Sequence, residues 1–96
     1  MDLILRPAAA ADVEEACSWY EQQRSGPGEE FLAVLDAGLR EIVAHPLRQA
    51  IVFRDARRLL LERFPCAKFY RAYPNAVVVV ASMHGRRDPL RWRGRV

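Results

Sequence analysis

The residues best equipped for chemistry lie together near the C-terminal end, in the run His84-Gly85-Arg86-Arg87-Asp88-Pro89. His84 can transfer a proton near neutral pH, and the two arginines offer planar forks that match phosphate or carboxylate. Just beyond this run, arginine alternates with tryptophan over residues 91–93. Arginine interleaved with an aromatic ring can grip phosphate, stack on bases or anchor a protein interface.

This segment has two functional interpretations and one purely structural one. A target-binding surface would use Arg86, Arg87, Asp88, Arg91, Trp92 and Arg93. A catalytic site would rely on His84 and Arg87, although a lone histidine without a second acid–base group has little catalytic power. In the structural interpretation, Asp88 bridges an arginine and fixes the turn, and His84 bonds to the backbone or to Asp88.

Charge is distributed unevenly along the chain. The 96 residues carry a formal net charge of +3, but eleven arginines and one lysine follow residue 47, against three acids. A basic half of this kind suits phosphate or an acidic partner, and the preference for arginine favours forked contacts. A solvated basic surface is the alternative that composition leaves open.

The bulk composition predicts one small domain spanning residues 1–96, with half of its residues hydrophobic. Cys17 and Cys66 lack metal-type spacing, so we expect buried free thiols rather than a disulfide, and no metal or other cofactor. The first residues are too short and too charged for a signal peptide, and no apolar run is long enough to span a membrane. We therefore expect a cytoplasmic protein with no membrane partner.

The stretch that must position the C-terminal chemistry is Ala76–Val80, a run of four valines that suits a central strand covered on both faces. Upstream, residues 3–6 predict a short opening strand stopped by Pro7. Residues 8–11 are expected to be a linker, and Asp12 is expected to be the N-cap of a first helix, with Glu15 completing a capping box.

The first helix is expected to run to about Arg24, burying Val13, Ala16, Cys17 and Tyr20, with Trp19 beside this stripe. A turn at residues 25–28 leads to a second amphipathic helix that ends at Pro46. Gly38 weakens this helix and is expected to allow close contact with the first one.

Strands follow, predicted at 51–53, 57–64 and 67–73, with Phe69 and Arg71 on one face of the third and Lys68 and Tyr70 on the other. The predicted class is α+β, in the order β-α-α-β-β-β with an extra short edge strand. A helical hairpin covers only one face of such a sheet. We therefore expect a partner or the tail, residues 90–96, to shield part of the second face, the tail being too short to form a stable element alone.

The ordered set of local sequences resembles the RelE/ParE toxin superfamily, and its ParE-like members in particular. It comprises residues 19–23 with 28–32, Arg57-Arg58 with Leu60, residues 63–65, residues 69–71 and finally residues 84–89. The resemblance implies a two-layer fold with the first strand beside the last. It also implies the toxin of a type II toxin–antitoxin pair, held by a small antitoxin in a hetero-oligomer.

ParE-like members inhibit DNA gyrase, whereas RelE-like members cut messenger RNA on the ribosome. Where RelE-like nucleases often carry arginine, this chain has Ala67, and no tyrosine follows Tyr73. The expected lysine-rich surface is reduced to Lys68. These departures favour a gyrase inhibitor over a nuclease, and a non-toxic binding module is the third hypothesis. For the antitoxin we expect contacts at Arg57, Arg58, Arg63 and Trp19, with acidic side chains on the partner.

Overall fold

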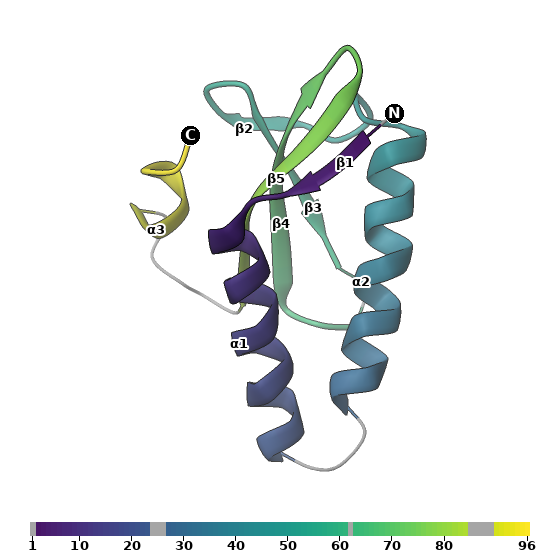
Figure 1. Ribbon diagram of the computed structural model, residues 1–96, viewed down its shortest axis with the longest axis vertical. Coiled ribbons are helices and arrows are strands. Elements are labelled where there is room, and N and C mark those ends of the chain that lie inside the picture. Colours follow the sequence, from purple (N-terminus) through teal and green to yellow (C-terminus); the bar gives the residue numbers. More distant parts are fainter. Residues whose placement is uncertain (1, 24–26, 62, 85–89) are drawn as a thin grey trace.

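The computed structural model describes residues 2–23, 27–61, 63–84 and 90–96, without the side chains of Pro27, His84, Leu90 and Arg91. Two long helices, α1 (Pro7–Gln23) and α2 (Pro27–Ala44), follow the first strand, β1 (Asp2–Leu5). The remaining elements are β2 (Ile51–Phe53), β3 (Ala56–Leu60), β4 (Cys66–Tyr73), β5 (Ala76–His84) and a short helix, α3 (Leu90–Arg93). Their arrangement is shown in Figure 1.

The described strands form a five-stranded sheet in the order β1-β5-β4-β3-β2. The last four strands in the sequence form the predicted antiparallel meander, and β1 runs parallel to β5, with Leu3 opposite Val77. The α+β class, the edge strand at 51–53 and the placement of the first strand beside the last are therefore confirmed. The prediction for residues 57–64 was too long, because Arg63 has a left-handed φ of 66° and turns the chain after Leu60.

Helix α1 begins earlier than predicted. Pro7 occupies its first position, where the missing N–H costs no hydrogen bond and the fixed φ suits the helix. Residues 8–11 are thus helical rather than a linker. Asp12 lies inside the helix and is buried, so the prediction that it is an N-cap was wrong. The buried positions of α1 are Ala9, Asp12, Ala16 and Tyr20, spaced by three or four residues as one helix face requires.

The two long helices cover one face of the sheet, called here the near face. Ala9 and Ile42 pack there against Val77 and Val79. Towards the tip of the hairpin, the rings of Tyr20, Phe31 and Phe64 form a cluster with centroids 4.9–5.5 Å apart. This core fixes how the helices lie on the strands.

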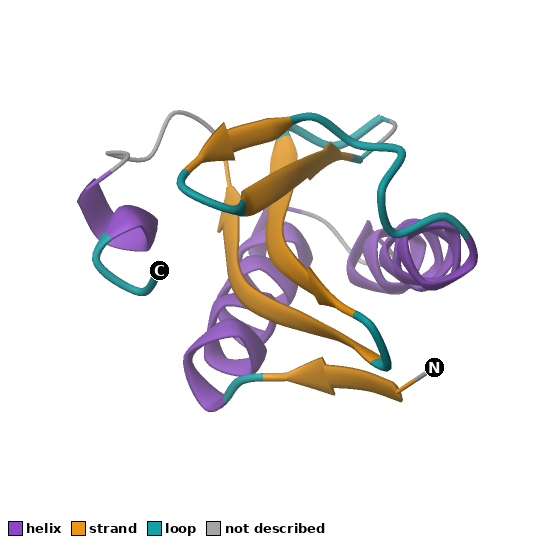
Figure 2. Ribbon diagram, turned by 90° about the horizontal axis from the view of Figure 1, so that it is seen from above, coloured by secondary structure: helices purple, strands orange, loops and turns teal. Residues whose placement is uncertain are grey.

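The opposite face, called the far face, is covered in part by α3. Val80, Ala81 and Met83 pack there with Phe69 and Trp92. Viewed from above, the strands separate α3 from α2 (Figure 2). The expectation that the tail shields the second face is confirmed, and so is the need of the valine strand for cover on both sides.

A β-bulge between β4 and β5 changes the alternation of side chains. Phe69 lies opposite Ala81 while Tyr70 lies opposite Val79, so Val80 is the extra residue. Val80 and Ala81 consequently both belong to the far-face cluster, and the next residue, Ser82, returns to the near face opposite Lys68. The bulge thus decides which side chains of β5 enter the helix-covered core.

Candidate macromolecule-binding surfaces

A groove of about 590 Å³ runs between α2 and β3. Small apolar residues of α2 and the leucines at the end of β3 and just after it line most of it, with one acid and one arginine: Ala33, Val34, Ala37, Gly38, Glu41, Leu59, Leu60, Leu61 and Arg63. Leu60 is 65% exposed although it is a large apolar residue. The groove therefore offers an apolar floor that a partner's side chains can cover.

Gly38 sets how closely α2 approaches the sheet. A Cβ added at this position would lie 3.0 Å from Cδ2 of both Leu59 and Leu61. The close contact expected of Gly38 thus exists, but it is with these leucines and not with α1. Glycine has a lower helix propensity than most other residues, but its lack of a side chain lets α2 pack closely against the leucines beneath it.

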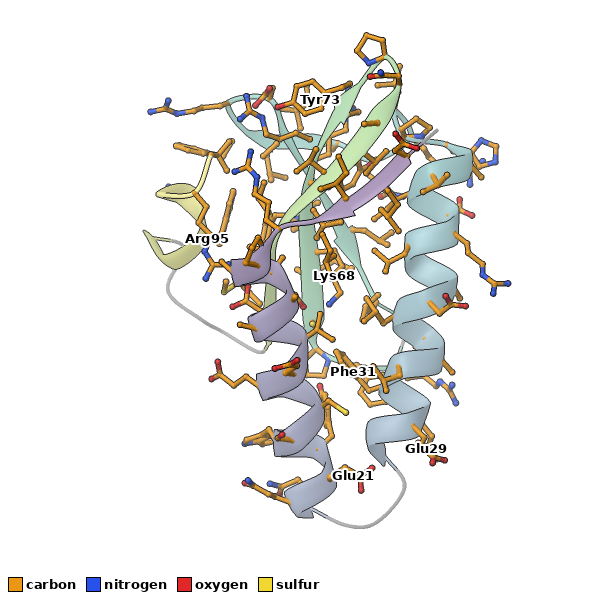
Figure 3. The ribbon with its side chains drawn as sticks, in the orientation of Figure 1. Glu21, Glu29, Phe31, Lys68, Tyr73 and Arg95 are labelled. Atoms are coloured by element: carbon orange, nitrogen blue, oxygen red, sulfur yellow. The ribbon has the colours of Figure 1, made fainter. Side chains whose placement is uncertain are left out.

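A chain of polar groups is buried beneath the helices, and its Lys68 lies between α1 and α2, above Phe31 in the view of Figure 3. Lys68 is fully buried, and its Nζ bonds to Ser82 Oγ, which is 3.5 Å from Cys66 Sγ. The same ammonium lies 5.4 Å from the centroid of the Phe31 ring. Burial lowers the pKa of Lys68, because removal from water penalises the charged amine. Lys68 was expected on the surface, and its place in the core removes it from any contact with nucleic acid.

An ion pair joins the C-terminal tail to α1. Arg95 Nη1 is 2.6 Å from Asp12 Oδ2, and the same guanidinium donates to the carbonyl of Val80 at 3.2 Å. Asp12 Oδ2 also accepts a hydrogen bond of 3.0 Å from the backbone N–H of Ser82. The Asp12 carboxylate thus connects α1, β5 and the tail. This connection explains the position of α3, which ends shortly before Arg95.

On the far face, Trp92 stacks on Phe69 with ring centroids 3.8 Å apart and planes 12° from parallel. Phe53 meets the same indole edge-on at 5.8 Å. Trp92 is only 6% exposed, so its ring belongs to the core and has no open face for a partner. The expectation that Trp92 contacts a target does not fit this burial, because the far face needs a large apolar cover.

Around this stack lies a basic–aromatic patch, defined here as Phe53, Arg54, Arg71, Tyr73 and Arg93. The guanidinium carbons of Arg93 and Arg54 lie 5.0 and 5.4 Å from the Phe53 ring centroid. Arg71 lies 5.8 Å from the Tyr73 centroid and holds Asp55 through two hydrogen bonds. Of the predicted target-binding residues, Arg93 is exposed and belongs to this patch. Arginines above aromatic rings keep their outer N–H groups for anions.

The predicted antitoxin contacts lie on different surfaces. Arg57 donates from Nη1 to the carbonyls of Gln49 and Leu47, at 2.7 and 3.3 Å, and therefore fixes the loop after α2. Arg58 is opposite Phe69, whereas Arg57 is opposite Tyr70, so the two arginines occupy opposite faces. The two side chains therefore do not form one face of the strand, although both were predicted to contact the antitoxin.

The other two predicted contacts are surface residues. Arg63 lines the groove between α2 and β3. Trp19 is 45% exposed on α1, and its ring meets Tyr20 edge-on at 5.2 Å. Both side chains therefore present surface that a partner can cover.

Several predicted residues lie outside what the structure describes. These are Arg86, Arg87 and Asp88, together with the side chains of His84 and Arg91. The backbone of residue 84 is described, ending β5 opposite Cys66. The target-binding and catalytic interpretations of these side chains stay predictions.

The sequence analysis missed the pairing of Asp12 with Arg95 and the burial of Lys68. For Lys68 there was a signal: it shares a face of β4 with Tyr70, and that face is the one the helices cover. Among the described residues, no group of three or more His, Cys, Asp or Glu could hold a metal ion. Both cysteines are free thiols, as predicted, and Cys66 is buried, whereas Cys17 is half-buried rather than fully buried. No helix in the described part is long and apolar enough to cross a membrane.

Comparison with solved structures finds a similar fold. A chain of the structure described as "Chromosomal ParDE TA system from P. aeruginosa" superposes with a TM-score of 0.78 at 17% sequence identity. The match covers 90% of this chain and 97% of the other. No protein-family model matches the sequence, and no curated protein matches it. The fold is therefore shared with a chain of a ParDE system over nearly the whole length.

Proposed function

We propose that this chain is the ParE-like toxin of a type II toxin–antitoxin pair and that it inhibits DNA gyrase. The observation that carries the proposal is the likeness to a chain of a ParDE system over 90% of this chain. The ordered motifs noted in the sequence point to the same family. A fold shared at low identity supports the class of protein, and the target must be argued from the surfaces.

Two features of the described surfaces favour binding over RNA cleavage. Cleavage through a 2′-hydroxyl needs an acid–base pair and cations around the scissile phosphate. On the far face, the central strands present Phe69, Val80 and Ala81 beneath the Trp92 ring. On the near face, Lys68 is sealed under the helices. The exposed arginines of the patch are suited to reversible binding of a protein or nucleic-acid surface.

The groove between α2 and β3 is the site that we assign to the antitoxin. An amphipathic segment laid along it would bury Leu60 and contact the small residues Ala33 and Ala37 of α2. Acidic side chains on that segment would meet Arg63, which lines the groove. We infer a cytoplasmic hetero-oligomer of toxin and antitoxin.

The first test is growth. Induced expression of the chain alone should arrest growth, and coexpression of the small acidic protein expected in the neighbouring reading frame should relieve it. If cells that express the chain alone continue to grow, the result would favour the non-toxic binding module and overturn the proposal.

The second test separates the targets. The purified chain should block supercoiling by gyrase in vitro, and transcripts in arrested cells should stay intact. Normal supercoiling at high excess of the chain, together with transcripts cut within codons, would assign the chain to the ribosome-dependent nucleases instead.

A further inference from the structure

We propose that a second copy of this chain pairs with β1, forming a two-fold symmetric dimer in which the two sheets become continuous. The pairing is antiparallel and centred on Ile4. Leu3 then lies opposite Leu5 of the second copy, and Asp2 lies opposite Arg6. This proposal does not depend on the toxin activity or on the antitoxin groove.

The outer edge of β1 carries the hydrogen-bonding groups that such pairing needs. The N–H of Asp2 donates to the carbonyl of Asn75, and the N–H of Arg6 donates to that of Val79. Backbone groups alternate in direction along a strand, so Leu3 and Leu5 direct theirs away from β5. Figure 2 shows β1 at the outside of the sheet, with no described element beyond it.

The side chains of this edge are unusually apolar for a surface strand. Leu3, Ile4 and Leu5 are 41%, 46% and 37% exposed. Natural sheets protect their edges with short strands, bulges, charges or cover, because an exposed apolar edge pairs with other chains. The opposite edge is protected in this way: β2 has three residues, an irregular register and Arg54 at its end. β1 has a regular register and no such interruption.

Charge complementarity selects a second copy of this chain as the occupant. The strand and its flanks read acid, leucine, isoleucine, leucine, base over residues 2–6. Turned end for end, this pattern places each acid opposite a base and each leucine opposite a leucine. Parallel pairing in register would instead set like charges side by side, which is unfavourable.

The hydrogen-bond pattern agrees with the same register. With the axis at Ile4, the pairs between Leu3 and Leu5 are the ones that exchange N–H and carbonyl bonds. The pairs at Ile4 and between Asp2 and Arg6 are then the non-hydrogen-bonded kind, whose Cα atoms approach to about 4.5 Å and whose side chains interact most strongly. Arg6 Nη1 donates to the carbonyl of Arg95, and its guanidinium has further donors for a carboxylate.

A charge-swap experiment tests the pairing. The full-length protein should sediment at low micromolar concentration as a species of about twice the 11.0 kDa of one chain. Asp2→Arg alone and Arg6→Asp alone each set like charges across the axis, and each should weaken dimerisation about tenfold or more. An equimolar mixture of the two variants should restore a dimer containing one chain of each, because every cross-pair is again opposite in charge. Circular dichroism of each variant controls for folding.

Cysteine crosslinking tests the register in chains whose native Cys17 and Cys66 are replaced by alanine. Ile4→Cys should oxidise to a disulfide-linked dimer, since the two positions meet at the axis within disulfide range. Leu3→Cys and Leu5→Cys should not crosslink alone, and their mixture should. A wild-type chain that stays monomeric at tens of micromolar overturns the proposal. So does a dimer that both charge variants leave intact, or equal crosslinking at positions 3, 4 and 5.

Discussion

Arg95 and Asp12 form an ion pair 2.6 Å long across 83 positions of the sequence. Only 8% of the Asp12 side chain and 25% of the Arg95 side chain are exposed, so water screens the pair weakly. Because the carboxylate also accepts the N–H of Ser82, it ties α1, β5 and the tail together. Removal of either charge leaves the other one buried without its partner.

Arg95→Met should therefore lower the free energy of unfolding by about 2 kcal/mol, since the loss of one member of a largely buried pair leaves an uncompensated charge. Asp12→Asn should do so by a similar amount while keeping an acceptor for Ser82. Urea unfolding of both variants and of the double variant measures the coupling between the residues. If the double variant loses as much free energy of unfolding as the two single variants together, the residues do not interact directly.

Trp92→Ala should destabilise the protein by about 3 kcal/mol, because it removes the ring that stacks on Phe69 and leaves a cavity on the far face. Trp19→Ala is the matched control. Trp19 is 45% exposed, so its loss should cost about 1 kcal/mol or less. Thermal unfolding followed by circular dichroism compares the two, and equal losses would show that Trp92 is not part of the core.

Lys68→Met should change how stability depends on pH. Burial lowers the pKa of Lys68 in the folded protein below its ordinary value of 10.5, so the unfolded chain binds more protons between those two values. The contribution of Lys68 to the free energy of unfolding therefore rises as pH increases through that window. Lys68→Met should remove this rise and add on the order of 1 kcal/mol at pH 7. Urea titrations from pH 7 to 10 check it, and identical pH profiles for the two proteins would refute it.

At the upper end of that pH range, stability also depends on Tyr20. Burial raises the pKa of Tyr20 to about 12, and Cys66 makes a smaller contribution in the same direction. A folded pKa above the ordinary 10.0 means that the folded protein keeps a proton which the unfolded chain loses. Stability from Tyr20 is complete below pH 10 and falls as pH rises towards 12. Tyr20→Phe should flatten the decline in the free energy of unfolding above pH 10. An unchanged slope there would assign the decline to other groups.

Ala37→Glu should weaken antitoxin binding at least about tenfold, because it places a charge on the apolar floor of the groove, facing a partner that we expect to be acidic. Arg40→Glu, on the same helix but outside the groove, should leave the affinity within about threefold. Calorimetric titration with the purified antitoxin measures both. If the two changes have the same effect, the antitoxin binds elsewhere.

Local patterns predicted much of this architecture. Residues 28–46 repeat apolar side chains at helical spacing, and the four valines require cover on two sides, so the helical hairpin and the central strand followed from them. The start of α1 did not, because Asp12 satisfies the local rule for a helix cap equally well. Its actual role depends on Arg95, a partner far along the chain that no local pattern indicates.

Local sequence patterns also did not indicate on which face of the sheet each β5 side chain lies. Strict alternation from Val77 would set Ser82 on the far face, and only the bulge at Val80 returns it towards Lys68. A bulge depends on how two strands meet and leaves no mark in a run of valines. The buried lysine, its hydroxyl partner and the apolar far face all depend on that one extra residue.

The pairing of residue 95 with residue 12 also has a consequence for biosynthesis. Asp12 of α1 is translated 83 positions before Arg95, the residue with which it pairs. Contacts of such long sequence separation form late and slow the folding of small domains. The native arrangement can therefore be completed only after translation reaches the tail. Until then, the first helix and the valine strand are not joined through the Arg95 side chain.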